Sequence, residues 1–164
     1  MKTILITGIA GFIGYHLAEK LVNNGFNIVG IDNINDYYDV QLKYGRLNEL
    51  GIEQNDAQHF LQQTISSKYG ERLIFVRMNL EDQESLPNLF ANHQFDCVVN
   101  LAAQAGVRYS IENPMAYGQS NLIGFLNLLE CCRHHNVSRL LYASSASVYG
   151  NSIDVPFTTD QDVN

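Results

Sequence analysis

The sequence has few of the residues that build metal centres, disulfides or nucleic-acid interfaces. Its three cysteines, Cys97, Cys131 and Cys132, form neither a CxxC pair nor a cysteine–histidine pattern with zinc-ligand spacing. We therefore expect no metal site and interpret the cysteines as small apolar residues of a cytoplasmic protein. Ten lysines and arginines oppose 17 aspartates and glutamates, and no basic run occurs. This balance argues against a nucleic-acid partner, because phosphate-backbone binding requires clustered positive charge.

Long hydrophobic runs are also missing. The N-terminal stretch MKTILITG is too short for a signal peptide or a membrane span, so we expect no membrane partner and a cytoplasmic location. The 164 residues, 46% of them hydrophobic, are enough for one domain with one core. No internal repeat, linker or low-complexity tract divides residues 1–164 into smaller units.

The sequence does contain a regular alternation of strand and helix patterns. Apolar runs predict strands at 2–7, 27–31, 72–78, 95–101 and 137–143. Helical spacing predicts helices at 12–23, 81–92 and 114–134, and two short inserted helices at 40–50 and 57–69. The residues from Gly106 to Pro114 are predicted to form a loop. This alternation predicts an α/β fold with a doubly wound parallel sheet, a Rossmann fold, which we expect to be truncated after the fifth strand.

The glycine motif Gly8-x-x-Gly11-x-x-Gly14 follows the first predicted strand and opens the first helix. In this position the first glycine permits a tight turn, the second lets a pyrophosphate approach, and the third allows the helix to pack on the strand. The free N–H groups of the helix N-terminus favour an anion. The alternative is that the glycines only punctuate a turn.

Asp32 ends the second predicted strand. A carboxylate there can accept hydrogen bonds from both ribose hydroxyls of an adenosine and would repel a 2′-phosphate, which favours NAD over NADP. The alternative is a structural Asp that begins a turn with Asn33.

Several motifs together resemble the extended short-chain dehydrogenase/reductase superfamily: the glycine spacing, Leu101-Ala102-Ala103, Asn121, and Ser144 to Gly150. More narrowly, four segments resemble UDP-glucuronate 4-epimerases of the NAD-dependent epimerase/dehydratase family. They are TGIAGFIGYHLAEKL, GIDNINDYYDVQLKYGRLNEL, LAAQAGVRYSIENPMAYGQSNLIGFLNLLE and SSASVYG. The resemblance covers the whole chain, and DNINDYYDVQLK is its most specific part.

The resemblance implies an NAD-binding site and a role for each matching residue. The pyrophosphate would be held by Gly8, Gly11, Phe12, Ile13 and Gly14, and the adenosine ribose by Asp32, Asn33 and Asn35. Asn79-Leu80 stands where the family has Asp-Leu beside the adenine. The nicotinamide would be lined by Ala102, Ala103 and Gln104, with Asn121 nearby.

Ser145 matches the family's catalytic hydroxyl, which contacts the O4 atom of the sugar, and Ser147 is a candidate for contact with the sugar carboxylate. A polar loop at a strand end is the alternative for both serines. Arg108 is a candidate for binding an anionic sugar or phosphate, with a solvated loop arginine as the alternative. Related dehydratases carry Thr-Asp-Glu where this chain has Ser145-Ala146-Ser147, so water elimination is not expected.

The superfamily's general base is a tyrosine in a Tyr-x-x-x-Lys motif, and this motif does not occur in the 164 residues. We therefore expect an incomplete NAD-binding Rossmann domain, without a substrate domain, that is inactive alone. The resemblance predicts the NAD-binding part of an isomerase that interconverts UDP-glucuronate and UDP-galacturonate through a 4-keto intermediate, with a UDP-sugar substrate. The alternative is a catalytically inactive nucleotide-binding module. We also expect self-association through the last strand or through the helix at 114–134.

Overall fold

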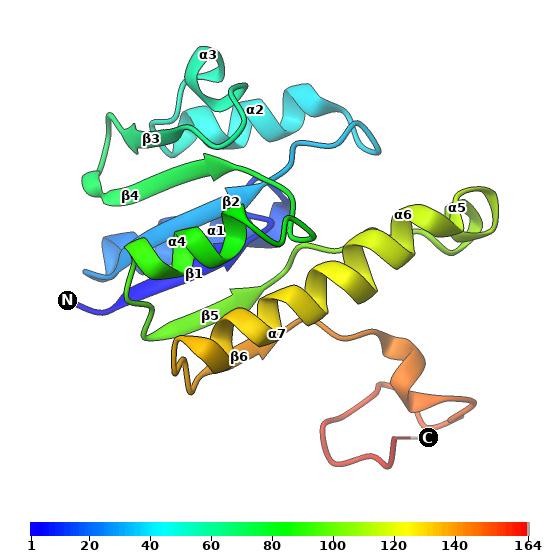
Figure 1. Ribbon diagram of the computed structural model, residues 1–164. Coiled ribbons are helices and arrows are strands. Elements are labelled where there is room, and N and C mark those ends of the chain that lie inside the picture. Colours follow the sequence, from blue (N-terminus) through cyan, green and yellow to red (C-terminus); the bar gives the residue numbers. More distant parts are fainter. Residues whose placement is uncertain (164) are drawn as a thin grey trace.

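The computed structural model describes residues 1–163, and its centre is a six-stranded sheet in the order β3-β4-β2-β1-β5-β6 (Figure 1). The strands are β1 (Thr3–Thr7), β2 (Asn27–Asp32), β3 (Gln63–Ser66), β4 (Gly70–Arg77), β5 (Cys97–Asn100) and β6 (Leu140–Tyr142). Strands β4, β2, β1, β5 and β6 run parallel, whereas β3 pairs antiparallel with β4 at one edge. The predicted doubly wound parallel sheet is confirmed, and the strand order reverses between β1 and β5, where such sheets bind ligands.

Helices connect the parallel strands. They are α1 (Phe12–Asn23), α2 (Val40–Glu49), α3 (Gln54–Ala57), α4 (Ser85–Asn92), α5 (Val107–Glu112), α6 (Pro114–Tyr117) and α7 (Phe125–His134). A π-helical segment, Gly118–Gly124, joins α6 to α7, so the predicted helix at 114–134 is confirmed as three consecutive pieces. A short 3-10 helix, Ala146–Tyr149, follows β6.

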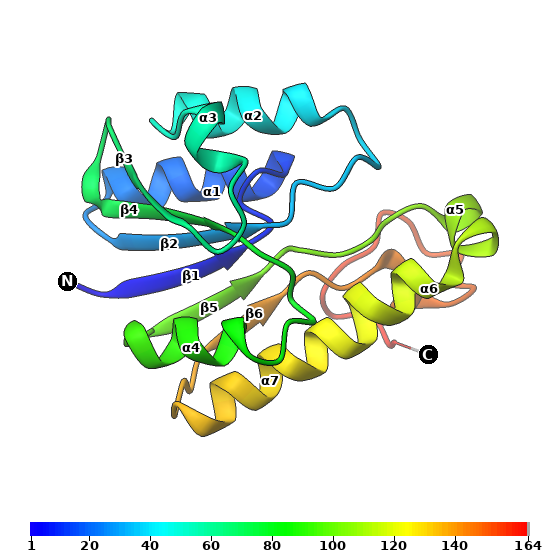
Figure 2. The ribbon, with the colours of Figure 1, turned by 45° about the horizontal axis from the view of Figure 1, so that its top comes forward.

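The helices form two layers, with α1 and α2 on one face of the sheet and α4 and α7 on the other (Figure 2). Side chains alternate between the faces along each strand. In β1, Ile6 packs in one cluster with Ala18 of α1 and Leu47 of α2. Its neighbour Leu5 packs in a second cluster with Leu128 of α7. Because both faces are covered, β1 and β2 are buried along nearly their whole length.

The prediction of a helix at 57–69 is wrong. Residue Ala57 ends α3, Leu61 adopts a left-handed backbone with φ of 62°, and Gln63–Ser66 form β3. In β3 exposed and buried residues alternate, with Thr64 opposite Phe75 and Ile65 opposite Ile74 of β4. Alternation with period two over four residues is too short to distinguish from one face of a helix. The sheet therefore has a sixth strand, inserted before the third strand of the parallel series.

The prediction of a loop between Gly106 and Pro114 is also wrong, because α5 occupies most of it. This helix has six residues and buries none of their side chains, and its two aliphatic residues, Val107 and Ile111, are too few to predict a helix. The last strand is shorter than the predicted range 137–143.

The cysteines are partly as expected. Cys131 and Cys132 of α7 are buried, and burial raises the pKa of both thiols to about 11, whereas Cys97 is only half-buried. Among residues 1–163, no helix combines the length and the apolar character needed to cross a membrane.

Candidate functional site

A groove lies at the carboxyl ends of β1, β2 and β5, with a volume of about 360 Å³. Most residues predicted to bind the cofactor line it: Gly8, Gly11, Phe12, Ile13, Gly14, Asp32, Asn33, Asn35, Leu80, Ala102, Ala103 and Gln104. A second hollow of about 660 Å³ adjoins the groove and shares residues 101–105 with it. Ser145 and Asn121 line this second hollow. The structure thus brings glycine loop, acidic strand end and catalytic-serine candidate to one edge of the sheet.

The glycine loop is a tight connection that only glycine fits. Gly8 has a φ of +72°, and its N–H donates to the Ile31 carbonyl over 2.8 Å. A Cβ on Gly14 would lie 2.1 Å from the Gly8 carbonyl oxygen, so α1 packs directly against the turn. No side chain caps the start of α1 at Gly11, which leaves N–H groups of its first turn available for an anion.

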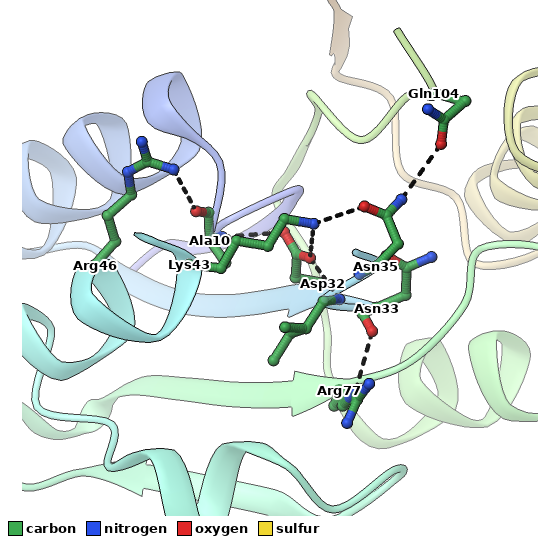
Figure 3. Close-up of polar contacts among 9 residues, drawn as sticks. Ala10, Asp32, Asn33, Asn35, Lys43, Arg46, Arg77 and Gln104 are labelled. Carbon is green, nitrogen blue, oxygen red and sulfur yellow. Dashed lines mark hydrogen bonds and ion pairs between the residues drawn. The ribbon is translucent and has the colours of Figure 1, made fainter. Parts of the chain in front are cut away.

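The carboxylate of Asp32 is buried at the end of β2 and is held from three sides (Figure 3). It accepts hydrogen bonds from the N–H of Ala10 over 3.2 Å and from the N–H of Ile34 over 2.8 Å. The Nζ atom of Lys43 lies 3.7 Å from its Oδ1 atom. Asp32 therefore has a structural role in the turn and also lines the groove.

A chain of polar contacts crosses the groove from Lys43 (Figure 3). Lys43 donates to Asn35 Oδ1 over 2.9 Å, and Asn35 Nδ2 donates to Gln104 Oε1 over 3.4 Å. Gln104 is in turn fixed by Asn121: its N–H donates to Asn121 Oδ1 over 2.8 Å, and Asn121 Nδ2 donates to its carbonyl over 2.9 Å. Asn121 belongs to the π-helical segment, and its side chain reaches the loop after β5.

The loop after β5 is positioned by Thr7. Its Oγ1 atom donates to Asn100 Oδ1 and accepts from the N–H groups of Leu101 and Ala102 over 3.1 and 3.0 Å. Thr7 is fully buried, so these bonds fix where Ala102 meets the groove.

Not all predicted residues come to the site. Ser145 Oγ donates to Ser147 Oγ over 3.1 Å and accepts from its N–H, but Ser147 itself lines neither hollow. Arg108 is exposed on α5 and lines neither hollow. Asn79 is half-buried and also lines neither hollow. The neighbours of Asn79, Leu80 and Glu81, do line the groove.

Sequence reasoning missed several lining residues. They are Tyr37, Tyr38, Lys43, Glu81 and Ser120. Lys43 had one usable signal, because it lies one turn inside α2, which follows directly from the loop after Asp32. A buried lysine is rare without a charged partner, and Asp32 is that partner.

The model of the family described as GDP-mannose 4,6 dehydratase matches residues 5–164. The chain belongs to this family. Relatives of this chain carry names other than dehydratase, because UDP-glucuronate 4-epimerases are among them. The resemblance inferred from the sequence motifs is thereby confirmed.

Two curated relatives and one solved structure illustrate the similarity. Protein CapI of Staphylococcus aureus is 48% identical over 160 residues, which cover 98% of this chain and 42% of CapI. UDP-glucuronate 4-epimerase of Thermodesulfobacterium geofontis is 39% identical over 98% of this chain and 44% of the relative. The structure of UDP-glucuronic acid 4-epimerase from Bacillus cereus, in complex with UDP-glucuronic acid and NAD, superposes with a TM-score of 0.76 and 29% identity. It covers 99% of this chain, which spans 46% of that structure. The family member described here thus spans less than half the length of these relatives.

Proposed function

We propose that this chain is the NAD-binding part of a nucleotide-sugar 4-epimerase that interconverts UDP-glucuronate and UDP-galacturonate through a 4-keto intermediate. The observation that carries this proposal is that the groove lined by Asp32 and the glycine loop shares residues 101–105 with the hollow lined by Ser145. The UDP-glucuronate 4-epimerases from Thermodesulfobacterium geofontis and Bacillus cereus match 98% and 99% of this chain.

The residues of the groove fit a dinucleotide. The uncapped start of α1 at Gly11 suits a pyrophosphate. Gly8 cannot carry a side chain here, because a Cβ on it would lie 2.9 Å from the backbone nitrogen of Ala102. The Asp32 carboxylate at the strand end suits a ribose with free hydroxyls. NAD, when bound, supplies the acceptor and donor for the hydride of the sugar C4 atom.

The chain's own residues would orient the reactants. Ser145 lines the second hollow, where its hydroxyl can hold the O4 atom of a sugar. Gln104 and Asn121 hold the loop that separates the two hollows. Epimerisation is favoured over water elimination because Ala146 and Ser147 offer no carboxylic acid where related dehydratases carry an Asp-Glu pair.

A chimera tests this function. Residues 1–164 of this chain would replace the matching region of the Thermodesulfobacterium geofontis epimerase, which supplies the remainder of an intact enzyme. We expect the chimera to convert UDP-glucuronate to UDP-galacturonate, measured by chromatography of the sugar nucleotides. Ser145→Ala in the chimera should lower kcat by about 100-fold, the usual cost of losing one positioned hydrogen-bond donor in a transition state.

The intact relative serves as the positive control, and its own serine-to-alanine variant as the matched one. A chimera that folds and binds NAD but shows no turnover would support the inactive binding module instead. Turnover that Ser145→Ala leaves unchanged would remove the proposed role of this residue.

A further inference from the structure

The two walls of the groove contact each other through several side chains. One wall is the loop after β2, which carries Asn35 and Tyr37, and the other is the segment after β5, which carries Gln104 and Tyr109. The loop before α2 and helix α5 both extend beyond the carboxyl ends of the strands, on the same side of the molecule (Figures 1 and 2). Asn35, Tyr37 and Gln104 line the groove, whereas Tyr109 lines neither the groove nor the second hollow.

The contacts between the walls are specific. The rings of Tyr37 and Tyr109 lie with their centroids 4.8 Å apart at an interplanar angle of 36°. Asn35 Nδ2 donates to Gln104 Oε1 over 3.4 Å. The Tyr37 hydroxyl lies above Gly106, where a Cβ would be only 2.1 Å from the hydroxyl oxygen. Gly106, with a φ of +102°, thus leaves room for the Tyr37 side chain to cross the gap.

The wall that carries Tyr109 is held by hydrogen bonds and ring contacts, such as those of Gln104 with Asn121 and of Tyr109 with Tyr117, and not by buried apolar side chains of α5. Helix α5 buries no side chain, and its apolar residues Val107 and Ile111 are 84% and 80% exposed. Asn113 Nδ2 donates to the Tyr109 hydroxyl over 3.0 Å, and the Tyr117 hydroxyl donates to the carbonyls of Ala105 and Gly106. A segment with so little buried apolar surface opens at a small free-energy cost compared with the core.

We propose that the Tyr37–Tyr109 and Asn35–Gln104 contacts form a clasp that opens to let a dinucleotide enter or leave the groove. This inference rests on the proposed function, since it takes a dinucleotide as the ligand. The two contacts join the walls on either side of the groove, so the clasp opposes both entry and exit of the dinucleotide. Loosening it changes both rates in the same direction and leaves their ratio nearly constant. Loss of a direct ligand contact would instead raise the dissociation rate and weaken binding.

Tyr109 is the residue to vary, because it holds the clasp without lining the groove. We expect Tyr109→Ala to raise both the association and the dissociation rate of NADH by about three- to tenfold, the range that corresponds to loss of one aromatic pair. Tyr109→Phe keeps the ring and loses only the hydroxyl, so both rates should stay within about twofold of the original values. The rates are measured by stopped-flow fluorescence of NADH, with excess NAD as the chase.

Tyr109→Leu provides a second variant, which keeps apolar bulk and removes the ring. Hydrogen exchange of the amides at 105–112 in the ligand-free protein should be faster in the Ala and Leu variants than in the Phe variant. Unchanged rates in Tyr109→Ala, or a faster dissociation with correspondingly weaker binding, would overturn the clasp while leaving the proposed function intact. Absence of NADH binding by the unmodified protein would overturn both.

Discussion

Asp32 combines two roles in one side chain. Its oxygens hold the turn after β2 by accepting from the N–H groups of Ala10 and Ile34, and its charge is paired with Lys43. A carboxylate has about four acceptor positions, so two amides leave room for ribose hydroxyls. The same charge opposes a 2′-phosphate, but Lys43 lies close enough to attract one if Asp32 is neutralised. The cofactor preference therefore depends on the balance between these two charges.

We expect the protein to bind NAD more tightly than NADP, and Asp32→Ala to weaken NAD binding by about 1 to 3 kcal/mol through loss of charge-assisted hydrogen bonds. Asp32→Asn, which keeps the size and removes the charge, should shift the ratio of NAD to NADP affinity towards NADP. Titration calorimetry with both cofactors measures these effects.

Asp36→Ala is the matched control. Asp36 is an exposed carboxylate in the same loop, but its side chain does not line the groove. The ratio of NAD affinity to NADP affinity separates a direct charge effect from partial unfolding, because partial unfolding would weaken the binding of both cofactors equally. Equal affinities of the unmodified protein for the two cofactors, or no binding at millimolar concentration, would refute the assignment of Asp32.

Among the elements, α4 shows how one side chain decides where a helix begins. Asp82 accepts from the N–H groups of Glu84 and Ser85 over 3.0 and 2.8 Å. These backbone amides, that of Ser85 first, lower the pKa of Asp82 below its ordinary value of 3.8. Glu84, next to the helix start, makes no such bond with its side chain. The two carboxylates are therefore a natural pair for comparison.

We expect Asp82→Ala to lower the free energy of unfolding by about 0.5 to 2 kcal/mol at neutral pH, the range for loss of a capping side chain, and Glu84→Ala to have a much smaller effect. The folded pKa is depressed, so the contribution of Asp82 is present above the unfolded value and is lost as the pH falls through the folded value. The difference between the original protein and Asp82→Ala should accordingly shrink below about pH 4. Urea unfolding followed by circular dichroism over a pH series measures it, and a difference that grows on acidification would contradict the argument.

How well each element was predicted depended on how much of it is buried. The predicted bounds of helix α1 and strand β2 agree with the structure to within one residue. Helix α1 has an apolar stripe along one side, and strand β2 is apolar on both faces, so both patterns are clear. Strand β3 has four residues at a sheet edge, and α5 buries nothing, so neither pattern could specify its element. Local sequence predicts an element where packing against the core requires a periodic pattern of apolar residues, and it does not predict the element where no such pattern is required.

The site divides in the same way. The glycine loop and Asp32 could be predicted because they adjoin a strong strand pattern and act through local backbone geometry. Lys43, Tyr37 and Tyr38 could not, because their places in the groove depend on how the insertion after β2 folds back over the sheet. The contact between Asn35 and Gln104 joins residues 69 positions apart, and no spacing in the sequence encodes it.

At the scale of the whole molecule, a stripe of exposed apolar residues runs along the π-helical segment and α7. Leu122 and Leu126 are 72% and 60% exposed, and Leu129 continues the same stripe at helical spacing, while Leu128 faces the core. Phe125, between Leu122 and Leu126 in the sequence, is half-buried and packs against Tyr142 of β6, with ring centroids 5.2 Å apart. Exposed apolar stripes of this kind usually mark a contact surface.

We expect the 164-residue protein to self-associate through this stripe, so that its mass by light scattering rises with concentration above 18.5 kDa. The double variant Leu122→Gln/Leu126→Gln should shift the equilibrium towards the monomer, because it replaces apolar area that association would bury. Ile153→Gln is the control, since Ile153 is equally apolar and highly exposed but lies outside this helix. If association persists in the double variant, the outer edge of β6, with its exposed Leu141 and Tyr142, becomes the contact instead. A constant mass of 18.5 kDa up to high micromolar protein would show that neither surface associates.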